Sequence, residues 1–260
     1  MMDFSAPRSL KHEYDLYVEN EIELYKDSIS RTVLLKIGDE AVASLQAQTQ
    51  LAMNEILLCV EVDKIIRKRQ RIPTYATWRK RELKRRAEQA EFLRPEHWGV
   101  SADSALVREV HFQPRSHVLV AGAEGTSAAR YLAAQGCSVT AISARASNDD
   151  VLNPADERLI AGRIASVEGG LKEWAPEEML SAVVCTPAAF AGLTAAERSK
   201  VFAILQSATQ DGGFHLVDTL IQNHAEPSLS ELRRNYKGWT ISVVDQGTSS
   251  RSFLARKQVA

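Results

Sequence analysis

Two glycines near the middle of the chain are the first residues whose spacing suggests binding chemistry. Gly122 and Gly125 follow the apolar run 117–121, which is typical of a buried strand. Residues 126–135 then carry helix-forming side chains, with Thr126 as a possible cap, and Gly136 ends that pattern. A glycine turn between strand and helix lets a ligand approach the backbone closely. This turn is therefore predicted to cradle a nucleotide-like ligand.

Few other residues have a pattern that predicts catalysis. Cys185 ends the apolar run 180–185, but no histidine or asparagine signature surrounds it as a nucleophile would need. His215 lies inside an apolar run, which favours a structural histidine over a general base. Asp218 follows at the end of that run and is better placed to face a ligand. The histidines show no metal-ligand spacing, so no metal is expected.

The elements that would position these residues alternate between strand and helix patterns. A second apolar run, 138–143, completes one strand–helix–strand unit. Further strands are predicted at 163–167, 180–185 and 214–218, and a final antiparallel pair of strands at 239–244 and 252–256. Helices are predicted at 155–161, 194–209 and 227–235, and a tight turn is predicted at 211–213. This order predicts an α/β sandwich with a mostly parallel sheet and a terminal hairpin.

The same stretches resemble class I S-adenosylmethionine (SAM) dependent methyltransferases, most closely the small-molecule group that includes tellurite-resistance-type enzymes. The resemblance covers about 118–256 and rests on segments 118–122, 139–142, 193–198, 210–217 and 238–241. It implies a Rossmann-like, seven-stranded methyltransferase fold and a possible SAM site. The cofactor-binding positions that it implies are Gly122, Ala123, Glu124, Gly125, Ser143, Gly170 and Cys185.

Carboxylates that the family uses at this site are missing from four equivalent places. Val120, Ser143, Gly170 and Ser181 stand where the resemblance implies an acid. Each lost charge-assisted hydrogen bond costs about 1.5–3 kcal/mol. Glu124, or an acid in 148–150, could replace one of these contacts, but four losses together predict a degenerate SAM site.

The first hundred residues have helical rather than alternating patterns. Tyrosine and aliphatic residues recur at helical spacing over 14–25, and a break follows at 27–30. One long helix is predicted from about 31 to 71. Its apolar stripe consists of Leu51, Leu58, Val62 and Ile65. A further helix is predicted from about 76 to 92, and 94–99 is predicted as the loop that joins two domains. We therefore expect a helical N-terminal extension over 1–99 and a methyltransferase-like domain over 100–260.

Charge is strongly segregated within this extension. Residues 1–60 carry ten acids and five bases, whereas 64–86 carries eleven bases and one acid. The candidate partner-binding residues are Arg67, Arg71, Trp78, Arg79, Lys80 and Arg81. One interpretation is a nucleic-acid or acidic-partner surface with an aromatic ring for stacking. The other is a set of solvated helix faces or a protein-docking surface, which the net charge of −1 favours.

Composition places the chain among ordinary globular proteins. Its 260 residues are 45% hydrophobic and 25% charged. The three cysteines lie far apart in apolar runs, which predicts reduced thiols and a cytoplasmic location. No apolar run approaches the roughly 18 residues that a membrane span needs.

Three functions remain open on this sequence. The preferred hypothesis is a methyltransferase-like pseudoenzyme that acts as a binding or assembly subunit and docks a protein partner or another copy of itself through the helical extension. The alternatives are an active SAM-dependent methyltransferase of a small molecule and a nucleic-acid-associated protein that uses the basic segment 64–86.

Overall fold

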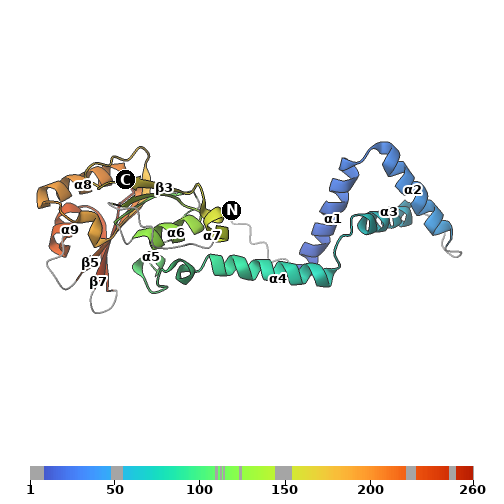
Figure 1. The fold of residues 1–260 in the computed structure, drawn as a ribbon, viewed down its shortest axis with the longest axis horizontal. Coiled ribbons are helices and arrows are strands. Elements are labelled where there is room, and N and C mark those ends of the chain that lie inside the picture. Colours follow the sequence, from blue (N-terminus) through green and yellow to red (C-terminus); the bar gives the residue numbers. More distant parts are fainter. Residues whose placement is uncertain are drawn as a thin grey trace. The chain divides into compact units, whose positions relative to one another are not determined.

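The computed structural model describes residues 9–47, 55–108, 111, 113, 115–122, 125–143, 154–220, 227–245 and 250–259. The chain divides into two compact units, Met1–Glu88 and Gln89–Ala260. Figure 1 follows the chain through both. The division falls within helix α4 (Tyr75–Phe92), earlier than the junction expected at 94–99. Residues of that expected loop form a short 3₁₀-helix, η1 (Pro95–Trp98), and Trp98 is buried in the second unit.

The second unit is built on a seven-stranded sheet with the order β3-β2-β1-β4-β5-β7-β6. Its strands are β1 (His117–Ala121), β2 (Ser138–Ser143), β3 (Ile164–Glu168), β4 (Leu180–Cys185), β5 (Thr209–Leu220), β6 (Thr240–Asp245) and β7 (Ser250–Arg256). The pairs among β1 to β5 are parallel, whereas β7 runs antiparallel to both β5 and β6. This arrangement confirms the predicted fold class.

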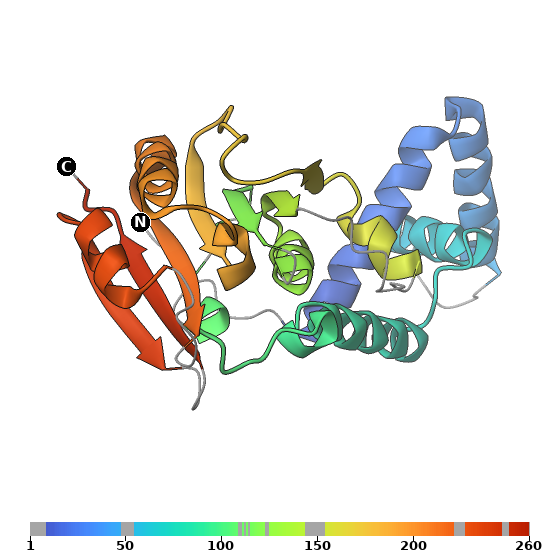
Figure 2. The ribbon, with the colours of Figure 1, turned by 60° about the vertical axis from the view of Figure 1, so that its left-hand side comes forward.

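Strand β1 shows why the sheet is covered on both faces. Val118 and Val120 belong to one buried cluster, whereas Leu119 and Ala121 belong to another. Successive side chains of a strand point to opposite faces, so a continuous apolar run requires cover on both. Helix α5 (Ala105–Arg108) precedes β1, α6 (Thr126–Ala134) connects β1 to β2, and α7 (Pro154–Ile160) lies between β2 and β3. The 3₁₀-helix η3 (Pro187–Phe190) and α8 (Ala195–Ala208) lie between β4 and β5, and α9 (Leu229–Asn235) lies between β5 and β6. Figure 2 shows helices on both sides of the strands.

Local signals fix the ends of several of these helices. Thr194 and Glu197 form a reciprocal capping box at the start of α8, and Ser228 caps α9 by accepting a hydrogen bond from the Glu231 N–H. Helix α6 differs from the expectation, because Gly125 rather than Thr126 is its N-cap residue. Gly136 follows α6 with φ of 93°, as expected of a glycine that stops a helix.

The glycines at 212 and 213 lie inside β5 rather than in a turn before it. The register between β4 and β5 shifts between Leu180 and Ala182, which marks a bulge. Gly212 has φ of 77°. A Cβ on Gly213 would lie 2.6 Å from Thr209 Cγ2 and 2.9 Å from the Ser181 carbonyl oxygen. The predicted turn at 211–213 was therefore wrong, because these residues belong to β5 and Gly213 serves a close approach to β4 at the bulge.

The first unit contains α1 (Leu10–Ser28), α2 (Arg31–Gln46), α3 (Glu55–Arg69) and the first part of α4. The prediction of one helix from 31 to 71 was wrong, because α2 and α3 pack against each other. Ser44 Oγ donates a hydrogen bond to Glu61 Oε1 at 2.8 Å across 17 residues of sequence. One straight helix would separate such residues by about 25 Å. No helix in the described ranges is both long and apolar enough to cross a bilayer.

An aromatic cluster holds α1 and α4 together in this unit. Tyr14 and Tyr17 of α1 lie 5.5 and 6.1 Å from the ring of Trp78, and Tyr14 lies 5.4 Å from Tyr75. Val62 and Ile65 of the predicted apolar stripe pack against this core, and their neighbour Ile66 is fully buried in it. Leu51, the first residue of that stripe, lies outside the described residues.

Candidate functional site

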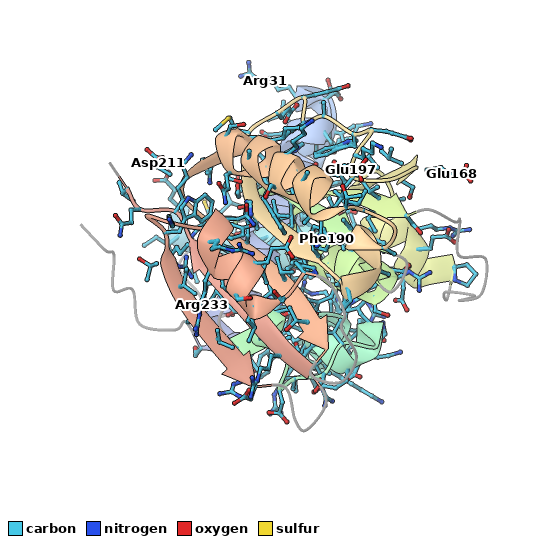
Figure 3. The ribbon with its side chains drawn as sticks, turned by 90° about the vertical axis from the view of Figure 1, so that its left-hand side faces the viewer. Arg31, Glu168, Phe190, Glu197, Asp211 and Arg233 are labelled. Atoms are coloured by element: carbon cyan, nitrogen blue, oxygen red, sulfur yellow. The ribbon has the colours of Figure 1, made fainter. Side chains whose placement is uncertain are left out.

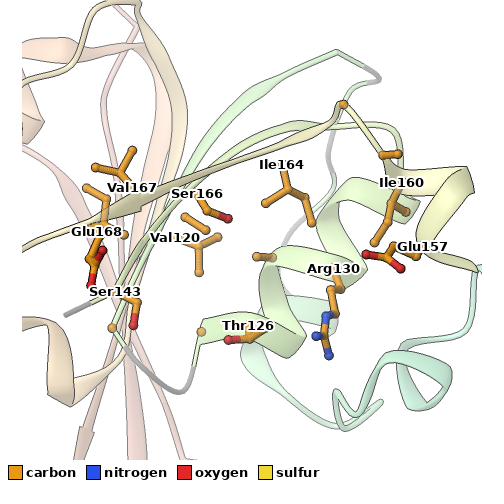
Figure 4. A pocket seen from close by; sticks show the side chains of 17 residues that line it. Val120, Thr126, Arg130, Ser143, Glu157, Ile160, Ile164, Ser166, Val167 and Glu168 are labelled. Carbon is orange, nitrogen blue, oxygen red and sulfur yellow. The ribbon is translucent and has the colours of Figure 1, made fainter. Parts of the chain in front are cut away.

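A cavity of about 570 Å³ lies between the first three strands and helices α6 and α7. It reaches the carboxyl ends of β1, β2 and β3. The order of the strands reverses between β1 and β4, so the cavity lies on the β1 side of the position where open α/β sheets bind ligands. The volume lies within the range of about 300–1,000 Å³ that small-molecule sites occupy. Figure 4 shows the side chains that line the cavity.

The first glycine of the predicted turn makes room for another part of the protein. Gly122 has φ of 110°, and its N–H donates to the Ile142 carbonyl at 2.9 Å. A Cβ on Gly122 would lie 2.0 Å from Thr186 Oγ1 and 3.1 Å from the Ala189 amide nitrogen. The chain that leaves β4 therefore occupies the space beside this glycine. Gly125 serves internal packing in the same way, because a Cβ there would lie 2.7 Å from a methyl carbon of Val120.

The carboxyl ends of β2 and β3 bring a hydroxyl and a carboxylate together. Ser143 and Glu168 are paired in the register of the two strands, and the Gly169 N–H donates to the Ser143 carbonyl at 3.1 Å. Both side chains line the cavity, and Figure 4 shows them next to each other. Sequence reasoning missed Glu168, because only the strand register shows that it lies beside Ser143. Figure 3 shows Glu168 at the margin of the protein, whereas Phe190 lies among other side chains.

Charged residues of the two helices line another part of the cavity. Arg130 comes from α6 and Glu157 from α7, and Figure 4 shows them away from the Ser143 and Glu168 pair. Between these two polar parts the lining is mostly apolar and includes Val120 and Ile164, with the hydroxyl of Ser166 among them. This combination of an apolar middle with a few polar groups is typical of a small-molecule pocket.

Of the predicted cofactor-binding residues, the structure brings Gly122, Gly125 and Ser143 to this cavity. Ala123 and Glu124 lie outside the described residues, as do Asn148, Asp149 and Asp150. Gly170 and Cys185 are not among the residues that line the cavity. Cys185 is buried within the core on the α8 face, where burial and then the Asp218 carboxylate raise the pKa of its thiol well above the usual value. A buried thiol of this kind is not a nucleophile.

Thr186 carries an unusual hydroxyl beside Gly122. Thr186 is 8% exposed, and its Oγ1 has no hydrogen-bond partner among the described parts of the chain. A buried polar atom without a partner destabilises the folded state by about 1–3 kcal/mol. The unpaired hydroxyl of Thr186 therefore lowers the stability of the folded state.

His215 is a structural residue, as the sequence favoured. Its Nε2 lies 2.7 Å from Thr209 Oγ1, and its Nδ1 lies 2.6 Å from the Tyr236 hydroxyl. Thr209 Oγ1 donates its hydrogen to the Leu205 carbonyl, so Nε2 carries the proton and Nδ1 accepts from Tyr236. Burial, and then the charge of Lys257, lower the pKa of His215 to about 3. A fully buried, neutral imidazole with both nitrogens paired is not available as a general base.

The candidate partner-binding residues of the first unit fall into two groups. Arg67 donates to the Tyr14 hydroxyl at 3.1 Å, and the ring of Trp78 packs in the aromatic cluster. The remaining four, Arg71, Arg79, Lys80 and Arg81, are exposed. The stacking ring that the sequence suggested is therefore engaged inside the unit.

Within the described ranges, no group of three or more histidine, cysteine, aspartate or glutamate side chains is arranged to hold a metal ion.

Several solved structures are similar to this chain. The N-methyltransferase NodS from Bradyrhizobium japonicum is 14% identical, with 67% of this chain and 97% of that one covered and a TM-score of 0.44. A TehB-like SAM-dependent methyltransferase from Corynebacterium glutamicum is 15% identical, with 56% of this chain and 83% of that one covered and a TM-score of 0.43. TehB from Haemophilus influenzae is 16% identical, with 65% of this chain and 67% of that one covered and a TM-score of 0.46. No family model and no curated protein matches the sequence. The fold therefore stands on the strand order and register described above.

Proposed function

We propose that this protein is a methyltransferase-like binding or assembly subunit whose α/β unit does not hold SAM and whose helical unit docks a partner. One observation carries this proposal. Thr186 occupies the space that Gly122 leaves open, with its Oγ1 at 2.0 Å from the position of a Cβ. In a site built for a nucleotide-like cofactor, a glycine here would admit the ligand to the backbone.

The polar groups of the cavity support the same conclusion. At the end of β2 the side chain is the hydroxyl of Ser143, which lacks the two acceptor oxygens of a carboxylate. Val120 lines the cavity as an apolar residue, and Gly170 has no side chain. These side chains support a site that lacks the carboxylates that the resemblance implies for SAM. The two groups with nucleophilic or basic chemistry that the sequence singled out, Cys185 and His215, are a neutral thiol and a neutral imidazole inside the core.

The helical unit supports a docking role. Several of its apolar side chains are more than half exposed, among them Leu24, Leu35 and Val60. Apolar side chains that gather in one place on the surface are typical of protein-binding sites, and Val60 lines a groove together with the buried Val18 and Ile22. We also retain the prediction of a cytoplasmic location, in keeping with three cysteines that form no disulfide with one another.

Calorimetric titration with S-adenosylhomocysteine tests the proposal for the cofactor site. We expect no binding in the micromolar range, for the wild type or for Ser143→Asp, because restoring one carboxylate leaves Thr186 in place. Micromolar binding by the wild type would overturn the proposal. Binding gained by Ser143→Asp alone would show that the missing acid, and not Thr186, is the obstacle.

The second candidate is an active SAM-dependent methyltransferase of a small molecule, and the pairing of Ser143 with Glu168 favours it. Glu168 would then supply the acceptor oxygens that Ser143 lacks. In the same titration this candidate requires that the wild type binds and that Glu168→Gln binds at least about tenfold more weakly, since about 1.4 kcal/mol corresponds to tenfold in affinity. Glu157→Gln, in the other polar part of the cavity, is the matched control.

A further inference from the structure

A second cavity, of about 600 Å³, is a groove between α1 and α3 within the helical unit. Val18 and Ile22 of α1 form its buried apolar floor, with exposed fractions of 7% and 5%. Val60 of α3 lines the same groove and is 58% exposed. The groove therefore offers an apolar strip that the described residues of this chain leave partly uncovered. Figure 1 shows the two helices that form it.

The two walls of this groove carry opposite charges. The wall formed by α1 presents Asp15, Glu19 and Glu23, whereas Lys64 and Arg67 line the α3 side. Asp63 also lies on α3, but its charge is compensated by Lys26 of α1 at 2.9 Å. Lys64 is likewise paired with Glu61 at 3.1 Å, Asp15 with Lys11, and Glu23 with Lys26. The charges that are left on the two walls are therefore Glu19 of α1 and Arg67 of α3, separated by apolar side chains.

Glu19 and Arg67 remain uncompensated on these walls. The ion pairs of α1 are made by Lys11, Glu13, Asp15, Glu23 and Lys26, and Glu19 makes none within the ranges that the structure covers. Arg67 donates to the neutral Tyr14 hydroxyl and has no carboxylate partner in those ranges. Each wall therefore presents at least one charge that a docked molecule could neutralise.

We propose that this groove docks the same groove of a second copy of the chain. A two-fold interface brings the same patch of both subunits together, so residue i meets residue j of the partner and j meets i. A surface with one acidic and one basic wall is complementary to itself under this symmetry. Glu19 of each copy then pairs with Arg67 of the other, and the exposed Val60 side chains become buried. A net charge of −1 gives two copies little mutual repulsion.

This inference rests on the proposed docking role of the helical unit and names its partner. It is tested with the full chain by light scattering coupled to size-exclusion chromatography at micromolar concentration. We expect a mass twice that of the chain. Glu19→Lys alone and Arg67→Glu alone each set two like-charged contacts against each other in a dimer, so each should weaken dimerisation by at least about tenfold.

The decisive sample is a mixture of the two variants. A Glu19→Lys copy carries cations on both walls and an Arg67→Glu copy carries anions on both, so a heterodimer of the two regains both opposite-charge contacts. We expect the mixture to form that heterodimer. Lys80→Glu, a charge reversal outside the groove, should remain dimeric, and circular dichroism should show that all variants keep their helices.

A monomeric wild type would overturn the inference, as would two monomeric variants that fail to combine. Both results leave the cofactor proposal standing, since S-adenosylhomocysteine binding is measured separately. Conversely, micromolar binding of S-adenosylhomocysteine would overturn the cofactor proposal. The inference of a dimer would still hold if the charge-reversal variants behave as expected.

Discussion

Arg198 of α8 makes two hydrogen bonds to the carboxylate of Glu231 in α9, from Nε at 2.8 Å and from Nη2 at 3.0 Å. The Arg198 side chain also donates to the Leu193 carbonyl at 2.7 Å, and the residue is 1% exposed. Such a paired fork of hydrogen bonds fixes both the distance and the orientation of two helices. The pair therefore holds α8 and α9 in place on the same face of the sheet.

Removing one partner of this pair should be strongly destabilising. Glu231→Gln leaves the Arg198 guanidinium buried without a compensating charge, and breaking a buried pair in this way costs about 3–5 kcal/mol. Denaturant unfolding measures the loss. Arg251→Gln, in the exposed pair with Asp245, is the control and should cost about 0.2–1 kcal/mol at most. Equal effects of the two substitutions would contradict a structural role for the buried pair.

Stability should fall as the pH drops below about 6.5, the ordinary pKa of histidine. His215 has a pKa of about 3 in the folded protein, so between these values the unfolded chain binds a proton that the folded chain does not. Its contribution is fully present above about pH 6.5 and is lost as the pH falls toward 3. Unfolding free energies measured between pH 7 and pH 5 should therefore decrease. A flat profile over that range would mean that His215 titrates normally.

The hydroxyl of Thr186 should be dispensable, whereas that of Thr209 should not. Thr186→Val removes a buried oxygen that has no partner in the described structure, so the free energy of unfolding should stay the same or rise by up to about 1–3 kcal/mol. Thr209→Val is the matched control, because that hydroxyl donates to the Leu205 carbonyl and contacts His215. Thermal melting compares the two. A loss of stability in Thr186→Val would reveal a partner for its Oγ1.

Any binding of polyanions should depend on the exposed cations of α4. We predict that the triple substitution Arg79→Gln, Lys80→Gln and Arg81→Gln lowers the salt concentration at which the protein elutes from immobilised DNA. Three lost phosphate contacts reduce the slope of log affinity against log salt by about 3. Arg85→Gln, a residue engaged with Glu82 at 2.6 Å, is the control. Retention that the triple substitution leaves unchanged would count against the nucleic-acid alternative.

Patterns that repeat along a strand or helix allowed much of the α/β unit to be predicted. The run 117–121 alternates between two buried clusters, so its apolar character is required by contacts on both faces. The capping box of Thr194 and Glu197 marks the start of α8 through hydrogen bonds between residues close in sequence. Apolar character alone does not identify the inward side of α8. Ile204 lies next in sequence to the buried Leu205, yet it is 44% exposed.

Features that depend on residues distant in sequence could not be obtained in this way. The segment between α2 and α3 contains no proline or glycine, so local propensity predicted one helix where the chain forms two that pack together. Trp78 lies between basic residues and suggested an exposed stacking ring. Its contacts with Tyr14 and Tyr17 come from a helix about 60 residues earlier, and only the tertiary structure shows them.

The sequence by itself determined the alternation of strands and helices, the mostly parallel sheet with its terminal hairpin, and the absence of acids at Val120, Ser143, Gly170 and Ser181. These follow from residue types and from periodicities that span a few residues. Only the tertiary structure decided that Thr186 fills the space beside Gly122, that Glu168 lies next to Ser143, and that Glu19 and Arg67 lie on opposite walls of one groove. Each of these depends on strand register or helix packing, which places together residues that no local pattern relates.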